Sequence, residues 1–265
     1  MSKALRVLIT GAARGVGMAT ARVLAGRGHA VVATDVTAPG GSEGIRGHVL
    51  DVTSDDSVAR CLAEVGPLDA IVNNAAIFLG GGPVEGFPLD RFRQTFETNT
   101  LGALRLIQAV LPAWRQRGSG VIVNVSSING RVSQPLRAAY SASKFALEAL
   151  TESLHYEVRH FGIRSVLIEP GLTATGTKVS EPHRGPAEYA GLWEQCVGAD
   201  TKMTGPSGGQ GADIVGLAIA GAIEDPATPL RVPVGRDAQT ILGLRRSLDD
   251  QGFEGAMRKA LGFTW

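Results

Sequence analysis

The chain has 265 residues with 26 Lys or Arg and 25 Asp or Glu, so its formal net charge is +1. The basic residues form no run, which argues against binding to nucleic acid or to a membrane surface. No apolar stretch reaches the roughly 20 residues that span a bilayer. Cys61 and Cys196 lack the spacing of metal ligands, so we expect no metal and a reducing, cytoplasmic setting.

Short apolar segments alternate with longer helical patterns along the chain. The segments lack polar alternation, which is typical of parallel strands covered on both faces, and most are separated by enough residues for a crossover helix. We expect one α/β domain over residues 1–265, a doubly wound, Rossmann-type parallel sheet with helices on both faces. The predicted strands are residues 7–10, 30–34, 48–50, 70–73, 121–125, 165–168 and 230–234.

Apolar residues at helical spacing predict helices over residues 15–27, 89–117 and 140–161. Gly162 stands where a C-cap glycine belongs. Residues 172–211 are rich in Gly, Pro, Thr and Ser and form the one irregular stretch, which we expect to be a substrate lid. The predicted core stripe of the third helix is Leu147, Leu150, Leu154, Val158 and Phe161.

A glycine-rich turn, Thr10-Gly-Ala-Ala-Arg-Gly-Val-Gly17, joins the first strand to the first helix. Glycine at 11 permits a sharp turn, glycine at 15 a close approach to a pyrophosphate, and glycine at 17 close packing of the helix on the sheet. The N–H groups and positive dipole end of the helix favour phosphate binding. The predicted cofactor contacts in this turn are Gly11, Arg14, Gly15, Val16 and Gly17, and a turn of small residues without a ligand is the alternative.

Asp35 ends the second strand, 24 positions after Gly11, near the distance at which an acid binds the adenosine ribose. Its carboxylate would repel a 2′-phosphate, which favours NAD over NADP. Arg14 is the counter-evidence, since an arginine can pair with that phosphate; the alternative for Arg14 is a solvated surface charge.

Two more segments are expected at the cofactor. Asp51 and Val52 follow the third strand, where Asp51 can bond the adenine amino group, although an N-cap or turn aspartate is the alternative. Asn74, Ala75 and Ala76 follow the fourth strand. The amide of Asn74 can bond backbone groups, and the small alanines leave room for a flat ring.

Tyr140 and Lys144 stand four apart at the start of a helix and so share one face. A free tyrosine has a pKa of about 10, and a nearby ammonium group would lower that pKa and make the phenol a usable acid or base. Ser127 follows the fifth strand, where its hydroxyl can bond a substrate oxygen; Ser126 is its competitor, and a turn serine is the alternative. Asn99 lies in the middle of a predicted helix, although asparagine is a poor helix former. Its presence is explained if it holds a water beside Lys144; the alternative is a polar contact on a half-exposed face.

Together these residues resemble the short-chain dehydrogenase/reductase family over residues 5 to about 235. The resemblance rests on T-G-x-x-x-G-x-G at 10–17, N-N-A-A at 73–76, Asn99, Ser127, Y-x-x-x-K at 140–144, and Pro170-Gly171 with Thr175. One departure is Ala76, where the family more often has glycine. Residues 231–237 weakly resemble members that act on steroid- or retinoid-like alcohols.

The resemblance implies a role for each matching residue. Tyr140 is then the proton donor or acceptor, Lys144 lowers its pKa and bonds the nicotinamide ribose, Ser127 orients the substrate oxygen, and Asn99 supports a proton-relay water. The segment of Pro170, Gly171, Thr173 and Thr175 is implied beside the nicotinamide.

We therefore expect an NAD-dependent oxidoreductase that interconverts a secondary alcohol and a ketone, with an apolar small-molecule substrate. The alternatives are an NADP-dependent ketoacyl reductase, against which Asp35 speaks, and a catalytically silent nucleotide-sensing protein. Phe145, Ala149, Glu152 and Tyr156 share a helix face away from the core stripe, which predicts a homodimer or homotetramer. Cover of that face by the chain's own helices is the alternative.

Overall fold

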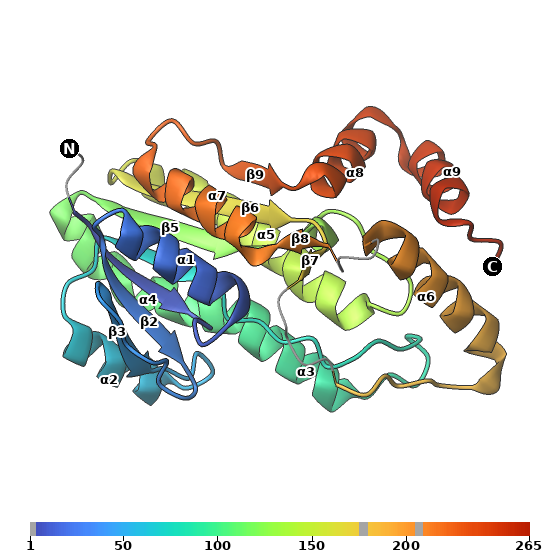
Figure 1. The fold of residues 1–265 in the computed structure, drawn as a ribbon, viewed down its shortest axis with the longest axis horizontal. Coiled ribbons are helices and arrows are strands. Elements are labelled where there is room, and N and C mark those ends of the chain that lie inside the picture. Colours follow the sequence, from blue (N-terminus) through green and yellow to red (C-terminus); the bar gives the residue numbers. More distant parts are fainter. Residues whose placement is uncertain (1–3, 175–179, 205–208) are drawn as a thin grey trace.

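The computed structural model describes residues 4–174, 180–204 and 209–265. Its central sheet has seven parallel strands in the order β3-β2-β1-β4-β5-β6-β9 (Figure 1). The strand order changes direction between β1 and β4, and parallel sheets bind ligands in the crevice at such a point. The strands are β1 Arg6–Thr10, β2 Ala30–Asp35, β3 Ile45–Val49, β4 Ala70–Asn73, β5 Gly120–Val125, β6 Ile163–Pro170 and β9 Arg231–Val234.

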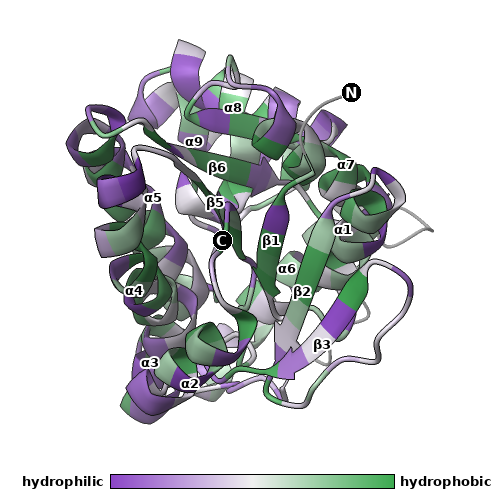
Figure 2. Cartoon of the chain, turned by 90° about the vertical axis from the view of Figure 1, so that its left-hand side faces the viewer, coloured by the Kyte–Doolittle hydropathy of each residue, from purple (hydrophilic) through white to green (hydrophobic). Residues whose placement is uncertain are grey.

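Helices cover both faces of this sheet, with α1 and α7 on one side and α2, α4 and α5 on the other (Figure 2). Neighbouring strand residues enter opposite apolar layers: Ile9 packs in the layer of α1 and Leu8 in the layer of α4. This two-sided burial explains why the strands lack polar alternation. The helices are α1 Gly15–Gly26, α2 Asp55–Val65, α4 Gly102–Arg117, α5 Ala138–Arg159 and α7 Ala212–Glu224.

Four further helices lie outside these layers: α3 Leu89–Phe96, α6 Ala190–Thr204, α8 Arg236–Ser247 and α9 Asp250–Leu261. Figure 1 shows α6 and α9 beyond the ends toward which the central strands point. A separate pair of short parallel strands flanks α6 in the chain: β7 Thr173–Ala174 precedes it and β8 Gln210–Gly211 follows it. Elements from the second half of the chain, among them α6 and α9, therefore lie over the carboxyl edge of the sheet.

The sheet confirms the predicted fold, but three local predictions are wrong. The helix expected over residues 89–117 is interrupted by a π-helical turn at Glu97–Leu101. The stretch 172–211 is not irregular throughout, because it contains the 15-residue helix α6; the lid role stays a prediction. Phe161 lies outside the core and is exposed, since α5 ends at Arg159.

Candidate active site

The glycine-rich turn packs tightly against the end of β4. Gly11 and Gly15 have φ angles of 64° and 56°, in the region that favours glycine. A Cβ on Gly17 would stand 2.4 Å from the carbonyl oxygen of Gly11 and 2.7 Å from the side-chain nitrogen of Asn74. No residue with a side chain can therefore replace Gly17 without moving this turn.

The amino end of α1 is open to an anion. Arg14 is its N-cap residue but makes no capping hydrogen bond with its side chain, and the first turn of the helix holds no acidic residue. No acidic side chain of the first turn of α1 therefore offsets the positive potential of the N–H groups at this end. Together with the compact glycine turn, this fits the pyrophosphate of a dinucleotide.

Asn74 holds the turn from the side of β4. Its side-chain nitrogen donates to the carbonyl oxygens of Thr10 at 2.9 Å and Gly11 at 3.0 Å. The Oγ1 of Thr10 in return accepts from the backbone N–H groups of Asn74 and Ala75, both at 3.0 Å. The predicted bonding of Asn74 to backbone groups is confirmed, and its effect is to clamp β1 to β4 at the crevice.

Asp35 and Asp51 lie at the carboxyl ends of β2 and β3 with different surroundings. The carboxylate of Asp35 accepts from the N–H groups of Ala13 at 3.1 Å and Val36 at 2.8 Å, so it borders the glycine turn. Asp51 accepts from both the N–H and the hydroxyl of Thr53, at 2.9 and 2.7 Å. Asp51 is thus a turn aspartate, which was the alternative to adenine binding. A contact between Asp51 and the adenine stays a prediction. Arg14 is exposed.

Asn99 lies in the π-helical turn and is buried, so a half-exposed face is the wrong explanation for it. Its amide binds the backbone of Ile77 twice: it accepts from the N–H at 2.8 Å and donates to the carbonyl at 3.1 Å. It also donates to the Oγ of Ser143 at 3.1 Å, and Ser143 donates to the carbonyl of Tyr140 at 2.7 Å. The turn therefore ties the segment after β4 to the first turn of α5. A water held by Asn99 stays a prediction.

Ser127, Tyr140 and Lys144 come together at the end of β5. The hydroxyls of Ser127 and Tyr140 are hydrogen-bonded. The Lys144 ammonium lies 5.8 Å from the centre of the Tyr140 ring and donates to the carbonyl of Val125 at 2.7 Å. Ser127 also accepts from the N–H of Asn129 at 3.1 Å, so its hydroxyl caps the short helical turn that follows as well as meeting Tyr140.

Ser126, the competitor of Ser127, faces a different environment. Its Oγ lies beside Gly130 and Glu148, because a Cβ on Gly130 would stand 2.6 Å from that oxygen and 2.9 Å from the Glu148 Cγ. Among the residues that the structure describes, the buried Ser126 hydroxyl has no hydrogen-bond partner. Ser127 is therefore the serine that meets the tyrosine.

Burial changes the acidity of both members of the pair. It raises the pKa of Tyr140, against the lowering effects of the Ser127 hydrogen bond and the nearby Arg137 charge. In the chain without a cofactor this burial effect is the largest one, so a lowering of the Tyr140 pKa by Lys144 stays a prediction. Burial also lowers the pKa of Lys144, to about 8, and its ammonium group donates to the Val125 carbonyl.

Behind Lys144 lies a group of buried charges that the sequence reading missed. Glu148, one turn further along α5, and Glu169, near the end of β6, are both almost fully buried. Arg231 lies 2.9 Å from Glu148, and Arg131 lies 3.4 Å from Glu169. Burial, together with the Glu148 charge, raises the pKa of Glu169 to about 7. One signal was present: Glu169 is an acid directly after the apolar run Val166–Ile168 of β6.

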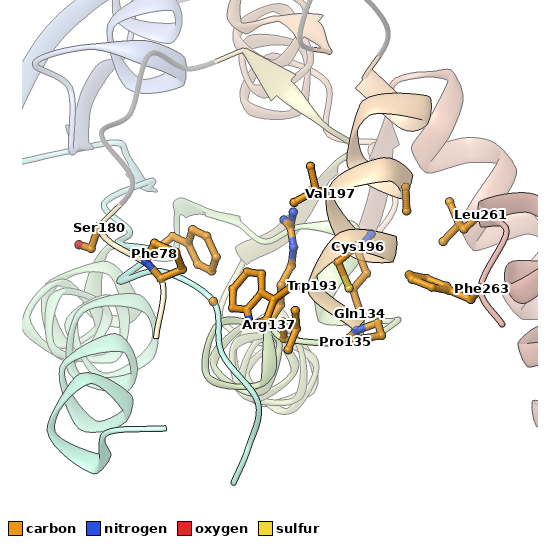
Figure 3. Close-up of a pocket in the computed structure, with 14 residues that line it drawn as sticks. Phe78, Gln134, Pro135, Arg137, Ser180, Trp193, Cys196, Val197, Leu261 and Phe263 are labelled. Atoms are coloured by element: carbon orange, nitrogen blue, oxygen red, sulfur yellow. The ribbon is translucent and has the colours of Figure 1, made fainter. Parts of the chain in front are cut away.

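Figure 3 shows an apolar cavity of about 220 Å³ that has Phe78, a neighbour of Tyr140, in its wall. The ring of Phe78 in its wall meets the Tyr140 ring edge-on at 5.7 Å, and the Arg137 guanidinium lies 5.6 Å from the Phe78 ring. The described residues lining the cavity are Phe78, Gly81, Gln134, Pro135, Leu136, Arg137, Ser180, Pro182, Trp193, Cys196, Val197, Ala199, Leu261 and Phe263.

Pro170 ends β6, and Gly171 is held against α8. A Cβ on Gly171 would overlap the carboxylate of Asp237, which accepts from the N–H of Leu172 at 2.7 Å. Thr173 donates from its hydroxyl to the carbonyl of Gly171 at 3.0 Å. Thr175 lies outside the described residues. The predicted nicotinamide end of the site thus begins beside the end of β5 that leads to Ser127, since β5 and β6 are neighbours in the sheet.

Comparison with known proteins supports this architecture. A sequence profile described as short chain dehydrogenase matches residues 5–184. The oxidoreductase YusZ of Bacillus subtilis is 32% identical over 96% of this chain and 97% of its own. Retinol dehydrogenase 8 of Bos taurus is 40% identical over 64% of this chain and 59% of its own. A short-chain dehydrogenase structure from Streptomyces avermitilis, 31% identical, superposes with a TM-score of 0.78 over 98% of both chains.

The chain therefore belongs to the short-chain dehydrogenase/reductase family of oxidoreductases. A Burkholderia cenocepacia member in complex with NADP is 24% identical and superposes with a TM-score of 0.78 over 96% of this chain and 98% of its own, which shows the shared fold. None of the described helices is long and apolar enough to cross a membrane.

Proposed function

We propose that this protein is an NAD-dependent oxidoreductase that interconverts an apolar secondary alcohol and its ketone, with Tyr140 as the acid or base. The observation that carries the proposal is the convergence of Ser127, Tyr140 and Lys144 at the end of β5, on the same edge of the sheet as the open amino end of α1. The bound nicotinamide supplies a hydride acceptor or donor. The chain's own residues then have to move one proton and to hold the substrate oxygen.

In the oxidation direction, Tyr140 must be deprotonated: its phenolate oxygen takes the proton of the alcohol hydroxyl while the carbinol carbon gives up a hydride, for which the nicotinamide would be the acceptor. Ser127, already hydrogen-bonded to Tyr140, holds the same substrate oxygen while its charge changes. Lys144 places a cation beside the phenol ring and, once the cofactor is present, binds its ribose. In the reduction direction, Tyr140 returns the proton to the ketone oxygen.

The apolar cavity supports an apolar substrate. Its walls include Phe78, Leu136 and Trp193, and the volume of about 220 Å³ lies below the roughly 300–1,000 Å³ of pockets for drug-sized ligands. Retinol, the compound named in the relative from Bos taurus, is a primary alcohol that is mostly hydrocarbon, so it supports the apolar character of the substrate and not the secondary position of its hydroxyl. This agrees with a substrate whose alcohol lies at Tyr140 and whose hydrocarbon part enters the cavity.

A panel of secondary alcohols and ketones with NAD(H) and NADP(H), followed by the nicotinamide absorbance, tests the proposal. We expect turnover of apolar secondary alcohols with NAD⁺ and of the matching ketones with NADH. A protein that binds the cofactor but turns over no member of the panel would support the nucleotide-sensing alternative instead.

Asp35→Ala should change the choice of cofactor. Asp35 borders the glycine turn, and removing its charge relieves the repulsion of a 2′-phosphate while Arg14 remains. One unit charge at about 4 Å contributes at least roughly 1 kcal/mol even in water, so the NAD/NADP ratio of kcat/KM should fall about fivefold or more. Asp56→Ala, an exposed acid in the first turn of α2, is the control. A wild type that prefers NADP would overturn the cofactor assignment.

We also propose a homodimer or homotetramer built on α5. Phe145 is 43% exposed and Tyr156 75% exposed, so the chain's own helices do not cover this face. The small Ala149 between them is exposed as well and would let a partner helix approach closely. Light scattering should give a multiple of the 27.6 kDa chain mass, and a lower multiple for the Phe145→Glu, Tyr156→Glu double variant. An unchanged mass in the variant would end this proposal.

A further inference from the structure

The apolar cavity has a catalytic end and a far end. Phe78 and Arg137 stand at the catalytic end, next to Tyr140. Figure 3 shows Phe263 and Leu261 on the opposite side, with the Phe263 ring directed toward Cys196 of α6. A substrate whose oxygen lies at Tyr140 therefore extends its hydrocarbon part toward Phe263.

The far end is built by a turn that follows α9. The helix ends at Leu261, and Gly262 takes a left-handed conformation with φ 75°. The N–H groups of Gly262 and Phe263 both donate to the carbonyl of Arg258 at 2.9 Å, which closes the helix end. This turn directs the chain back over α6 and places Phe263 in the cavity wall.

One side chain of α6 anchors the segment after that turn. The Oε1 of Gln195 accepts from the N–H groups of Thr264 at 2.9 Å and Trp265 at 3.2 Å, while its Nε2 donates to the Thr264 hydroxyl at 3.0 Å. Trp265 also stacks on Tyr189, with ring centres 6.4 Å apart. Gln195 does not line the cavity, so it acts on the cavity only through the segment that it holds.

We propose that Phe263, held in place by Gln195, closes the far end of the substrate cavity and sets the longest apolar group that the enzyme accepts. The inference rests on the proposed function. The limit is set by the side of α6 that faces the cavity, the last turn of α9 and the segment that follows it.

The test compares straight-chain secondary alcohols of increasing length with the full chain and NAD⁺. In the wild type, kcat/KM should rise about threefold to fourfold per added methylene until the cavity is full, and then fall. Phe263→Ala should move the maximum to longer alcohols and raise kcat/KM for alcohols beyond the wild-type limit about tenfold or more. The kcat for the shortest alcohol should not change.

Gln195→Leu keeps the cavity-lining side chains and removes the three hydrogen bonds to the segment. It should shift the length maximum in the same direction as Phe263→Ala, although by less. Lys259→Ala, an exposed position on α9, is the control and should keep the wild-type profile. The same length maximum in the wild type and both variants would overturn the inference while leaving the proposed function intact.

A binding measurement separates the two proposals. Straight-chain ketones titrated calorimetrically into the protein with NAD⁺ form a pair that cannot react, so their affinity is read without turnover. A length limit in wild-type affinity that Phe263→Ala extends would support the inference even if no alcohol were oxidised, in which case the proposed function fails. Affinity that rises equally with length in both proteins would overturn the inference.

Discussion

Tyr140→Phe should lower kcat by about 10²–10⁴-fold, the usual contribution of a positioned acid or base, with little effect on cofactor affinity. The substitution removes one oxygen and leaves the ring, whose edge-on contact with Phe78 is independent of the hydroxyl. Ser127 keeps its hydrogen bond from the N–H of Asn129, so the substrate-side serine stays in place. Steady-state rates and a fluorescence titration of NADH check the two halves of this prediction.

Two controls sharpen the result. Tyr156→Phe makes the same change on an exposed side chain of the same helix and should keep the wild-type rate. Ser127→Ala should impair turnover, whereas Ser126→Ala, which removes a buried hydroxyl with no partner among the described residues, should not. A Tyr140→Phe variant with near-normal kcat would remove the proposed mechanism.

The features that could be predicted from sequence are those set by neighbouring residues. The glycine turn follows from glycines at positions where φ is positive or where a Cβ has no room, as at Gly11 and Gly17. Tyr140 and Lys144 share a helix face because residues four apart always do. The central strands were identified because burial on both faces requires continuous apolar runs, and their ends differ from prediction by only a few residues.

The features that were missed depend on residues far apart in the chain. The π-helical turn exists where Asn99 reaches Ile77 and Ser143, and neither contact leaves a trace in the helical periodicity of residues 89–117. Glu148 and Glu169 meet only because α5 packs on β6. The upward effect of burial on the Tyr140 pKa was missed for a related reason: charged neighbours can be inferred from spacing, but the extent of burial cannot.

Lys144 is the residue at which catalysis and stability should separate. Its ammonium group is buried, and desolvation lowers the pKa of Lys144 from 10.5 to about 8. Folding therefore destabilises the charged form of Lys144, relative to its neutral form, by roughly 3 kcal/mol. At neutral pH the lysine is charged in both the folded and the unfolded states, so the folded state bears this cost.

The sign of the pH dependence follows from proton binding. Between pH 8 and 10.5 the unfolded chain still holds the Lys144 proton while the folded chain has released it. Because the unfolded state binds more protons in this window, this group makes the free energy of unfolding rise with pH there, and the contribution is constant below pH 8. A variant without an ionisable group at position 144 lacks this rise.

Lys144→Met should therefore lose activity without losing stability. Methionine fills the apolar part of the lysine site and removes the cost of burying a charge. Against this, the Val125 carbonyl loses its hydrogen-bond donor, which costs about 1–3 kcal/mol of stability. We expect kcat/KM to fall at least about 100-fold, while the free energy of unfolding at pH 7 stays equal to the wild-type value or exceeds it. Urea unfolding at pH 7 and at pH 9.5 checks this, since the difference should move in favour of the wild type at the higher pH. A variant that is several kcal/mol less stable at both values would contradict the desolvation argument, and one that keeps wild-type turnover would contradict the role of Lys144 in catalysis.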